Sequence, residues 1–598
     1  MRRPPDHPIG LARPTRRRFV QGLVLAGCAP TAVARMFMQA QSVSGAAVLS
    51  GQQLDLAIGA TPFNVTGFSA VATAVNGRVP APILRLRQGD AVWINVTNRL
   101  TEPTSLHWHG VRLPADQDGV PGLSFRGIMP GETFTYRFPI VQSGTYWYHS
   151  HSGMQEQTGL YGPLILVPSD PEPYSYERDY VVMLSDWTDE DPMTIVSNLK
   201  QQGDYYNYQR RTLGTLRDDA QRQSLRAALK ERLMWGGMRM NPTDIMDVTG
   251  ATYTFLVNGQ PPAANWMALF ARGEKVRLRF INASSMTTFD VRIPGLPLTV
   301  IAADGNDVEP VAVGEFRIGV AETYDVIVEP PEDTAYTIFA QAQDRSGYAR
   351  ATLAPRPGMT AAIPAMDSRP MRSMADMGMG SMAGMSGMSG MSGMAGMDMS
   401  GMDMANMPGM SGMPGVGAQA AAVNADGVDP KRLHGQPNVD NVTRQPRDRL
   451  GEAGDGLEGN RRRVLLYTDL KALKPDPEAR APEREIEFHL TGNMERWVWG
   501  FDGKKYSEAG PIRLKRGERV RFVLINDTMM EHPIHLHGFL FSVENGQGGR
   551  LPLKHTINVK PSERVSLVFT ADTPGLWAFH CHLLYHMMTG MFRTVIVA

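Results

Sequence analysis

The sequence predicts an all-β chain built from three Greek-key β-sandwich domains, and two observations support this prediction. The first is an internal repeat: Gly89, Gly273 and Gly517 each open a run of alternating apolar and polar residues that reaches an asparagine nine residues later. The second is the run of Gly, Pro and Asn turn residues between the apolar stretches, which is typical of short antiparallel strands. A chain of 598 residues is also too long for a single core.

Histidine pairs of the form His-x-His recur in the first and third copies of this repeat. The middle copy carries Val291 and Ile293 at two of the equivalent positions. Because side chains i and i+2 share one face of a strand, each pair presents two imidazoles together, and facing pairs can hold a cluster of several metal ions. The pairs are His107 and His109, His149 and His151, His535 and His537, and His580 and His582.

The repeat predicts domain boundaries at residues 46–170, 175–356 and 464–598. The first and third domains are expected to share the metal cluster, and the second to be a copy of the same fold without ligands. Residues 357–463 form a linker rich in Met and charged residues. An amphipathic stretch at 216–233 predicts a helical insertion in the second domain.

A second kind of metal site is indicated around Cys581. This residue lies between two histidines whose side chains face the other way, and His586 and Met591 follow closely. A Cys with two His and a weak Met is the ligand set of an electron-transfer copper site, and His532 supplies the second His. Carried into the first domain by the repeat, these positions become Thr104, Ser150, Gln155 and Leu160, so no such site is expected there. We assign no role to His7, His434, His489 and His555.

The N-terminus predicts export. Arg16 and Arg17 begin a twin-arginine pattern before a short apolar run, so residues 1–45 are interpreted as a signal region read by the twin-arginine (Tat) machinery. Residues 25–28 also resemble a lipoprotein box, which would anchor Cys28 to lipid. A small-x-small cleavage site at 32–34 favours ordinary cleavage, and both alternatives stay open.

Composition excludes some partners. Sixty basic and sixty acidic residues cancel, which gives no electrostatic argument for nucleic-acid binding. There are only two cysteines, and if Cys581 binds metal no disulfide framework remains.

The linker contains a methionine-rich segment. Sixteen of the 43 residues from Met371 to Met413 are methionine, and Val, Leu, Ile and Phe are absent, so we expect a disordered loop that builds no core. Thioether sulfur is a soft ligand suited to Cu(I), and close spacing predicts additional labile copper here. We expect Asp376, Asp398 and Asp403 to add oxygen ligands. The alternative is a neutral low-complexity spacer.

Together these motifs resemble the four copper motifs of the multicopper oxidases, over essentially the whole mature chain. The twin-arginine signal, residues 526–532 and the methionine-rich segment most resemble the periplasmic copper-resistance branch of that family. The resemblance implies three cupredoxin domains and four copper ions. A type 1 copper would use His532, Cys581, His586 and Met591, a type 2 copper His107 and His535, and a type 3 pair His109, His149, His151, His537, His580 and His582.

The implied activity is one-electron oxidation of a substrate coupled to reduction of dioxygen to water. We expect electrons to enter near His586, whose imidazole edge should lie nearest the surface, and to pass through Cys581 toward His580 or His582. Dioxygen reduction also consumes protons. Asp118 matches the family position for the acid on the type 2 side, with Asp116 as the fallback. Many relatives carry Glu directly after the type 1 His, but this chain has Met587, so another carboxylate is expected on the second route.

Three hypotheses for the substrate remain open. The first is Cu(I), held near Asp527, Met529 and Met530, for which the alternative is ordinary strand-end packing. The second is copper sequestration with incidental oxidase activity, and the third is laccase-like oxidation of phenols. The expected partners are dioxygen, Cu(I) or another small reductant, the Tat machinery and a copper chaperone.

Overall fold

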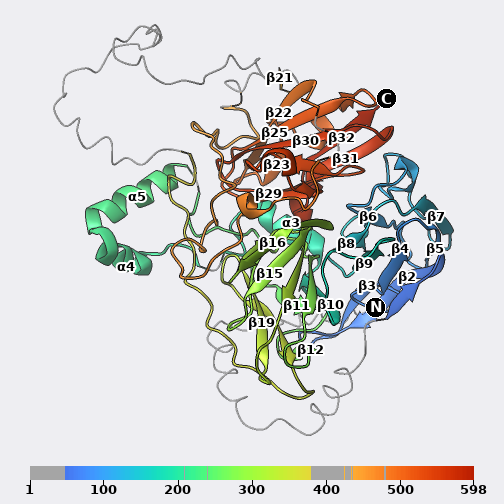
Figure 1. Ribbon diagram of the computed structural model, residues 1–598. Helices are drawn as coiled ribbons and strands as arrows, with labels where there is room; N and C mark the ends of the chain where they lie inside the picture. Colours follow the sequence, from blue (N-terminus) through green and yellow to red (C-terminus); the bar gives the residue numbers. More distant parts are fainter. Residues whose placement is uncertain are drawn as a thin grey trace, which may run out of the picture. The chain divides into compact units, whose positions relative to one another are not determined.

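The computed structural model describes residues 47–378 except 208 and 239, residues 423–424 and 433, and residues 435–598 except 477 and 479. The predicted signal region, Cys28 and most of the methionine-rich segment therefore lie outside the described residues. The described residues from Ala47 onward form one compact unit made mainly of strands, which confirms the predicted all-β class (Figure 1). None of the helices in the described part of the chain is both long and apolar enough to span a membrane.

The first domain is a sandwich of a five-stranded and a four-stranded sheet. Val92, Ile94 and Val96 are buried on one face of β5 and alternate with more exposed residues, because successive side chains of a strand point to opposite faces. They share one core with Leu84 and Leu164 of the other sheet. Across the sheets, the strands are β1 (Val48–Ser50), β4 (Ile83–Arg87), β9 (Tyr161–Val167), β8 (Gly144–His149) and β6 (His107–His109), and then β3 (Ala70–Val75), β2 (Gln53–Phe63), β5 (Ala91–Asn98) and β7 (Thr133–Pro139).

The second domain pairs a six-stranded with a five-stranded sheet, and its central strand β13 is buried along its whole length. Arg279 of β13 is therefore paired: it binds Asp179 and Asp325 and donates to Thr145 Oγ1 of the first domain at 2.8 Å. The strands are β11 (Thr254–Val257), β10 (Arg178–Trp187), β13 (Val276–Asn282), β18 (Thr323–Val328), β15 (Leu298–Ala303) and β16 (Asn306–Val313), and then β12 (Trp266–Leu269), β20 (Tyr348–Ala354), β19 (Tyr336–Ala342), β14 (Phe289–Arg292) and β17 (Phe316–Ile318).

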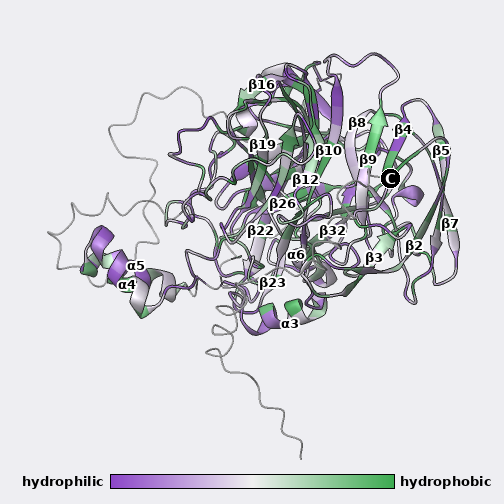
Figure 2. Cartoon of the chain, turned by 90° about the horizontal axis from the view of Figure 1, so that it is seen from below, coloured by the Kyte–Doolittle hydropathy of each residue, from purple (hydrophilic) through white to green (hydrophobic). Residues whose placement is uncertain are grey.

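The helical insertion expected at 216–233 is two helices, α4 (Leu213–Gln223) and α5 (Leu225–Gly237), which follow α3 (Pro192–Gln201). The chain turns at Ser224, whose φ of 86° is incompatible with a continuous helix, and the Ser224 hydroxyl accepts from the Ala227 N–H to begin α5. Figure 2 shows hydrophilic and hydrophobic residues side by side on α4 and α5.

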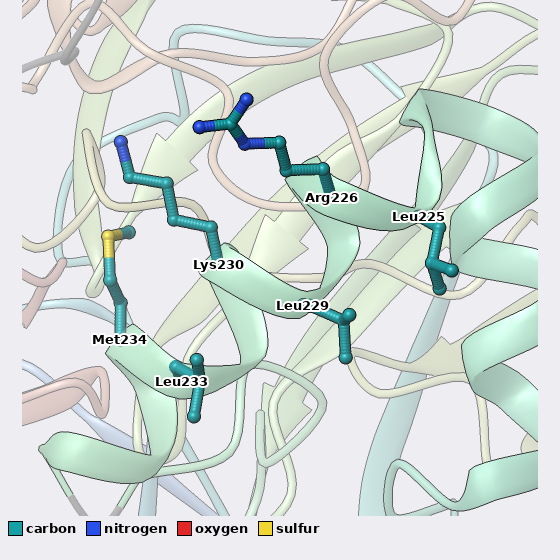
Figure 3. Close-up of a pocket in the computed structure, with 6 residues that line it drawn as sticks. All are labelled: Leu225, Arg226, Leu229, Lys230, Leu233 and Met234. Carbon is teal, nitrogen blue, oxygen red and sulfur yellow. The ribbon is translucent and has the colours of Figure 1, made fainter.

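A surface hollow of about 580 Å³ lies along α5. Figure 3 shows Leu225, Leu229 and Leu233 on one side of the helix, while Arg226 and Lys230 extend from another. None of its lining residues is a predicted metal ligand, so the hollow plays no part in the site described below.

The third domain contains a seven-stranded and a five-stranded sheet, with the short helix α6 (Leu584–Met588) between the last two strands. Its strands are β21 (Val423–Asn424), β22 (Arg484–Asn493), β25 (Arg519–Asn526), β30 (Arg564–Thr570), β27 (Phe541–Val543) and β28 (Leu553–Lys554), with β23 (Val498–Phe501) on β22, and then β24 (Ile512–Leu514), β32 (Phe592–Val597), β31 (Gly575–Cys581), β26 (His532–Leu536) and β29 (Thr556–Val559). Short 3-10 turns are η1 (Ala115–Gln117), η5 (Tyr467–Asp469), η6 (Tyr506–Glu508) and η7 (Gly548–Arg550).

The repeated asparagine makes the same hydrogen bonds in all three domains. Asn98, Asn282 and Asn526 are fully buried at the ends of β5, β13 and β25. Each side-chain oxygen accepts from the N–H two residues on, and each amide nitrogen donates to two backbone carbonyls. The asparagine thus fixes the loop that leads to the next strand, which bears metal-ligand candidates in the first and third domains, and it satisfies buried backbone groups there.

The histidine-bearing strands pair in one common register. In the first domain His107 lies opposite His149, and in the third domain His535 lies opposite His580. The corresponding pair in the second domain is Val291 and Ala340. The three sandwiches therefore place the same positions side by side, and only two of them supply imidazoles.

Candidate metal centres

The single-metal site predicted around Cys581 is assembled at one end of the third domain. His532 begins β26, Cys581 ends β31, and His586 lies on α6. The Cys581 Sγ lies 3.5 Å from His532 Nδ1 and 3.9 Å from His586 Nδ1, and the two nitrogens are 3.2 Å apart. Met591 is fully buried and its backbone bonds both Cys581 and His586. The three ligating atoms are thus close enough to share one ion.

The remaining ring nitrogens of this site are held by oxygen atoms. His532 Nε2 lies 2.7 Å from the Thr528 hydroxyl, and His586 Nε2 lies 2.8 Å from the Asp247 carboxylate. Such partners fix both rings with Nδ1 turned toward the thiol. Burial raises the pKa of the Cys581 thiol, so its thiolate form needs a cation beside it. The site therefore fits a soft metal ion.

The expectation that His586 lies nearest the surface is wrong. Its side chain is fully buried. Trp499 stacks on the imidazole with ring centroids 3.9 Å apart, and Asp247, from the second domain, covers the Nε2 edge while accepting from Trp497 Nε1 at 3.1 Å. Asp247 was missed by sequence reasoning, since it lies 339 positions before His586 and no local pattern marks the contact.

The eight histidines of the four His-x-His pairs lie together between the first and third domains. Their ring nitrogens form compact groups that each combine both domains. Two of these groups match the two halves of the expected type 3 pair, and His107 and His535, the expected type 2 ligands, share a third group with His109. The groups are His109, His149 and His582; His151, His537 and His580; and His107, His109 and His535.

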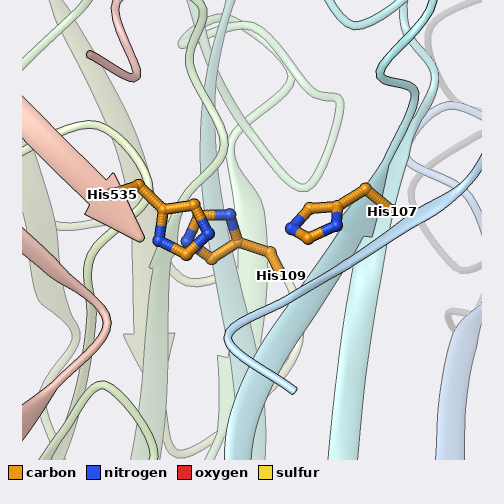
Figure 4. Close-up of side chains that lie close together, drawn as sticks. All are labelled: His107, His109 and His535. Atoms are coloured by element: carbon orange, nitrogen blue, oxygen red, sulfur yellow. The ribbon is translucent and has the colours of Figure 1, made fainter. Parts of the chain in front are cut away.

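The protein holds most of these rings by Nδ1 and leaves Nε2 free. His535 Nδ1 lies 2.6 Å from the carbonyl oxygen of His555, and His580 Nδ1 lies 2.9 Å from that of Cys581. Figure 4 shows His535 and His109 overlapping, with His107 beside them; the first two rings stack 3.8 Å apart. Among these eight rings, the buried nitrogens without a hydrogen-bond partner are His107 Nε2, His149 Nε2, His535 Nε2, both nitrogens of His582 and, by contrast, only Nδ1 of His109.

The electrostatics of the cluster favour neutral imidazoles. Burial, and then the neighbouring histidines, lowers the pKa of most of these rings, and that of His580 falls to about 3. A neutral imidazole with one nitrogen already bonded offers its other lone pair, which is the form that binds metal. Unpaired buried nitrogens are costly unless something binds them. The residues present therefore fit a cluster of metal ions.

Two carboxylates bridge the domains at this cluster. The Asp118 carboxylate lies 2.8 Å from His537 Nδ1 and 3.2 Å from His107 Nδ1, and the hydrogen bond of His107 Nδ1 goes to the Asp118 backbone carbonyl at 2.9 Å. Glu156 lies 2.7 Å from His149 Nδ1 and 3.9 Å from His582 Nδ1, and burial raises its pKa well above the usual range. The fallback residue Asp116 is exposed and contacts Gln117 instead.

Glu156 could have been found from the repeat. The offset that carries Cys581 onto Ser150 also carries Met587 onto Glu156. The carboxylate that this chain lacks after His586 thus stands at the equivalent position of the first domain.

The three residues suggested for a substrate copper are all buried. The Asp527 carboxylate accepts from His489 Nδ1 at 2.6 Å and from the Thr443 N–H at 2.9 Å. Met529 and Met530 are 1% exposed and belong to the main apolar core. This placement favours the alternative of strand-end packing.

Two histidines without an assigned role lie among the described residues. His555 is fully buried, and its Nδ1 is 3.2 Å from His109 Nε2 at the edge of the cluster. His489 pairs with Asp527. His7 and His434 lie outside the described residues.

Comparison with known proteins agrees with this architecture. Three family models described as multicopper oxidase match residues 58–171, 178–363 and 479–598. Among solved structures, that of Fet3p, a multicopper oxidase that functions in iron import, superposes with a TM-score of 0.62 at 19% identity, covering 92% of this chain and 90% of that one. The laccase from Botrytis aclada gives 0.58 at 21% identity over 93% and 88%.

The chain belongs to the multicopper oxidase family, and it is an oxidoreductase with copper as its cofactor. It is 51% identical to copper resistance protein A of Escherichia coli, over 98% of this chain and 99% of that protein. It is 53% identical to copper resistance protein A of Pseudomonas syringae pv. tomato, again over 98% and 99%.

Proposed function

We propose that this oxidase converts Cu(I) to Cu(II) in the periplasm and thereby serves copper resistance. Four Cu(I) ions, one O2 and four protons would give four Cu(II) ions and two water molecules. The product is less membrane-permeant than Cu(I). Copper bound at the two centres would supply the one-electron steps between substrate and dioxygen.

Four resident copper ions are proposed, in line with the ligand sets above. One type 1 ion is assigned to His532, Cys581, His586 and Met591, and one type 2 ion to His107 and His535. The type 3 pair is assigned to the two mixed triads, whose ring nitrogens lie close together across the domain boundary.

The observation that carries the substrate assignment is the Asp247 carboxylate on His586 Nε2. The carboxylate is fully buried, 2.8 Å from the ligand ring, and it reaches this ring from another domain. The negative charge of this carboxylate, directly bonded to an electron-accepting ligand, would favour a cation over a neutral molecule as the electron donor on this side of the site. A phenol would find no open face on His586, which Trp499 and Asp247 cover. The geometry therefore favours a metal-ion substrate over a laccase substrate.

The start of the methionine-rich segment supports the same assignment. Residues 371–378 are described and pack beside the loop that carries Asp247, since the Arg372 N–H donates to the Pro242 carbonyl at 3.0 Å. Met377 is 1% exposed and Met246 4% exposed in the same apolar cluster. Residues 379–413, on which labile copper was predicted, lie outside the described residues.

Substituting Asp247→Asn tests this function, with oxygen uptake measured first with Cu(I) and then with a phenol as sole reductant. Asn keeps an acceptor for Trp497 Nε1 but removes the charge. We expect cuprous oxidation to fall by roughly 10–100-fold, as for other partners of metal-ligating histidines, and phenol oxidation to fall much less. Asp247→Glu, which keeps the charge, is the matched control. Equal losses with both reductants would refute the assignment.

Deleting residues 379–413 separates the sequestration alternative from the oxidase. The deletion leaves the packed residues 371–378 in place. Under the proposed function, cuprous oxidation falls while phenol oxidation is spared. Under sequestration, most copper beyond four ions per chain is lost and turnover hardly changes.

Export to the periplasm rests on the twin-arginine pattern at Arg16 and Arg17. A fusion of residues 1–45 to a folded reporter should reach the periplasm, and replacing both arginines by lysine should block it. Retention of the exported protein in the membrane fraction, abolished by Cys28→Ala, would indicate a lipid anchor instead of plain cleavage.

A further inference from the structure

None of the described residues of the second domain belongs to the ligand groups above, yet one of its carboxylates holds the strand that borders the cluster. Asp304 follows β15, in a turn with φ of 46°. Its Oδ2 accepts from the backbone N–H groups of His555 and Thr556, both at 3.1 Å, and its Oδ1 accepts from the Thr323 N–H at 3.0 Å. All of these residues are buried. Asp304 therefore fixes the backbone at the start of β29.

This carboxylate is balanced by a buried cation. Lys554 Nζ lies 3.1 Å from Asp304 and 3.0 Å from Glu322, and neither the lysine nor the two acids is more than 1% exposed. A buried charge persists only when it is paired in this way. The arrangement ties the second domain to the third at the point where the cluster begins.

The fixed residues His555 and Thr556 contact ligands of both halves of the cluster. His555 Nδ1 and Thr556 Oγ1 are each 3.2 Å from Nε2 of His109, a ligand from the first domain. The His555 carbonyl accepts from Nδ1 of His535, a ligand from the third domain, at 2.6 Å. One dipeptide thus orients two rings that stack on each other.

The ring of His555 has little freedom to move. A Cβ at Gly110 would come within 2.3 Å of the His555 ring, so the backbone at Gly110, with φ of 77°, lies directly against the imidazole. On another side Tyr146 lies with its ring centroid 6.0 Å away. His555 is therefore held in place before any metal binds.

His109 is turned the opposite way from its neighbours. The buried nitrogen without a partner is Nδ1 in His109, whereas it is Nε2 in His107, His149 and His535; His582 has no hydrogen-bond partner on either ring nitrogen. A metal needs an unprotonated nitrogen, so the proton of His109 belongs on Nε2, where His555 and Thr556 accept it. Which ring nitrogen a histidine offers is set by the bond that the other nitrogen makes.

We infer that His555 and Asp304 are positioning residues of the trinuclear copper centre: His555 turns Nδ1 of His109 toward the metal, and Asp304 holds His555 there from the second domain. The domain without copper ligands is then part of the metal site. The inference concerns copper retention and does not depend on the identity of the substrate.

The test compares His555→Leu with His555→Asn in the full-length protein loaded with copper. Leu removes the Nδ1 acceptor at similar volume and leaves only the Thr556 hydroxyl, whereas the Asn side-chain oxygen lies near the position of His Nδ1 and can still accept from His109. We expect His555→Leu to retain the type 3 copper roughly 10–100-fold less tightly and to lose its near-ultraviolet band, while the red band of the Cys581 site stays. His555→Asn should retain both. Ile557→Val, in the same buried strand, is the control and should behave as the wild type.

A second pair of variants tests whether the second domain contributes to copper retention. This pair also tests the inference if His555→Leu does not fold. Asp304→Asn and Glu322→Gln each remove one of the two carboxylates on Lys554, but only Asp304 accepts directly from the backbone of His555 and Thr556. We expect Asp304→Asn to weaken type 3 copper retention and Glu322→Gln to leave it near the wild-type value. Equal copper retention in His555→Leu and His555→Asn, or in Asp304→Asn and Glu322→Gln, would overturn the inference.

Discussion

The first and third domains are two copies of one sandwich that use the same positions for different chemistry. Both pair their histidine strands in one register, His107 with His149 and His535 with His580, and both give imidazoles to the shared cluster. Beside the cluster they diverge. The third domain has Cys581 between its last two histidines, with its sulfur close enough to the nitrogens of His532 and His586 to share one ion, whereas the first has Ser150 at that place.

In the first domain a side-chain amide fills the position that His586 takes in the third. Gln155 Oε1 accepts from Thr104 at 2.6 Å and from Ser150 at 2.9 Å. Its Nε2 donates to Glu102 at 3.0 Å and to the Pro103 carbonyl at 2.9 Å. Every polar atom of the group is satisfied without a metal. The fold thus determines where four side chains meet, and their chemistry decides between a metal ion and a hydrogen-bond network.

The largest effect on oxygen uptake is expected when Cys581 of the third domain is replaced by serine, the residue that the first domain has at the equivalent position. Cys581→Ser replaces the soft ligand by the residue found at position 150, so the red absorption band of the thiolate should vanish and oxygen uptake should fall by more than about 100-fold, beyond the usual effect of losing a partner of a ligand. Copper content should drop by one ion per chain. Ser150→Ala is the control in the other copy. A retained red band would show that Cys581 is not the ligand.

A second difference between the copies affects stability. Strands β22 and β2 occupy the same place, and in β22 His489 is paired with Asp527, while the first domain has Ala57 and Arg99 at the matching positions. Burial alone would lower the pKa of His489, but hydrogen bonds to Asp527 and Glu487 raise it to about 10. His489→Ala leaves a buried carboxylate unpaired, and we expect the free energy of unfolding to fall by about 3–5 kcal/mol.

The pH dependence of the melting temperature tests the pairing of His489 with Asp527. Because the pKa of His489 is higher in the folded state than its ordinary value near 6.5, its contribution is complete below that pH and is lost as the pH rises toward 10. The melting temperature of the wild type should therefore decrease over this interval more than that of His489→Ala. Parallel pH profiles for the two proteins would contradict the assignment.

A smaller effect is expected where the two copies meet at the cluster. Asp118 of the first domain bonds one histidine from each copy. We propose that it holds a proton for dioxygen reduction on the type 2 side, with Glu156 as the carboxyl on the other. Asp118→Asn should slow reoxidation of the fully reduced protein by roughly 10–100-fold and affect reduction at Cys581 much less. Stopped-flow absorption can follow the two steps separately. Equal slowing of both would argue against a proton-holding role.

The sequence predicts those parts of this molecule that repeat. The glycine-to-asparagine spacing led to three sandwiches, and the same offsets gave the His-x-His pairs that the structure brings together. Glu156 follows from the offsets too. Asp247, Asp304 and His555 do not, because each acts across a domain boundary on a residue hundreds of positions away, and no local pattern records such a contact. The helix break at Ser224 was also missed, since hydrophobic periodicity continues through it.

The smallest effect is expected from the hydrogen-bonded site of the first domain. Gln155→Leu removes the acceptor shared by the hydroxyls of Thr104 and Ser150, both of which are buried. Leaving buried hydroxyls unpaired should lower the free energy of unfolding by about 1–3 kcal/mol, with no loss of the red band, because the Cys581 site lies in the other copy. Denaturant unfolding of the copper-free protein measures this, and the volume-conserving Leu160→Met serves as control. If Gln155→Leu is as stable as Leu160→Met, the amide is not what stabilises the position, and the difference between the copies rests on Cys581 and the two histidines alone.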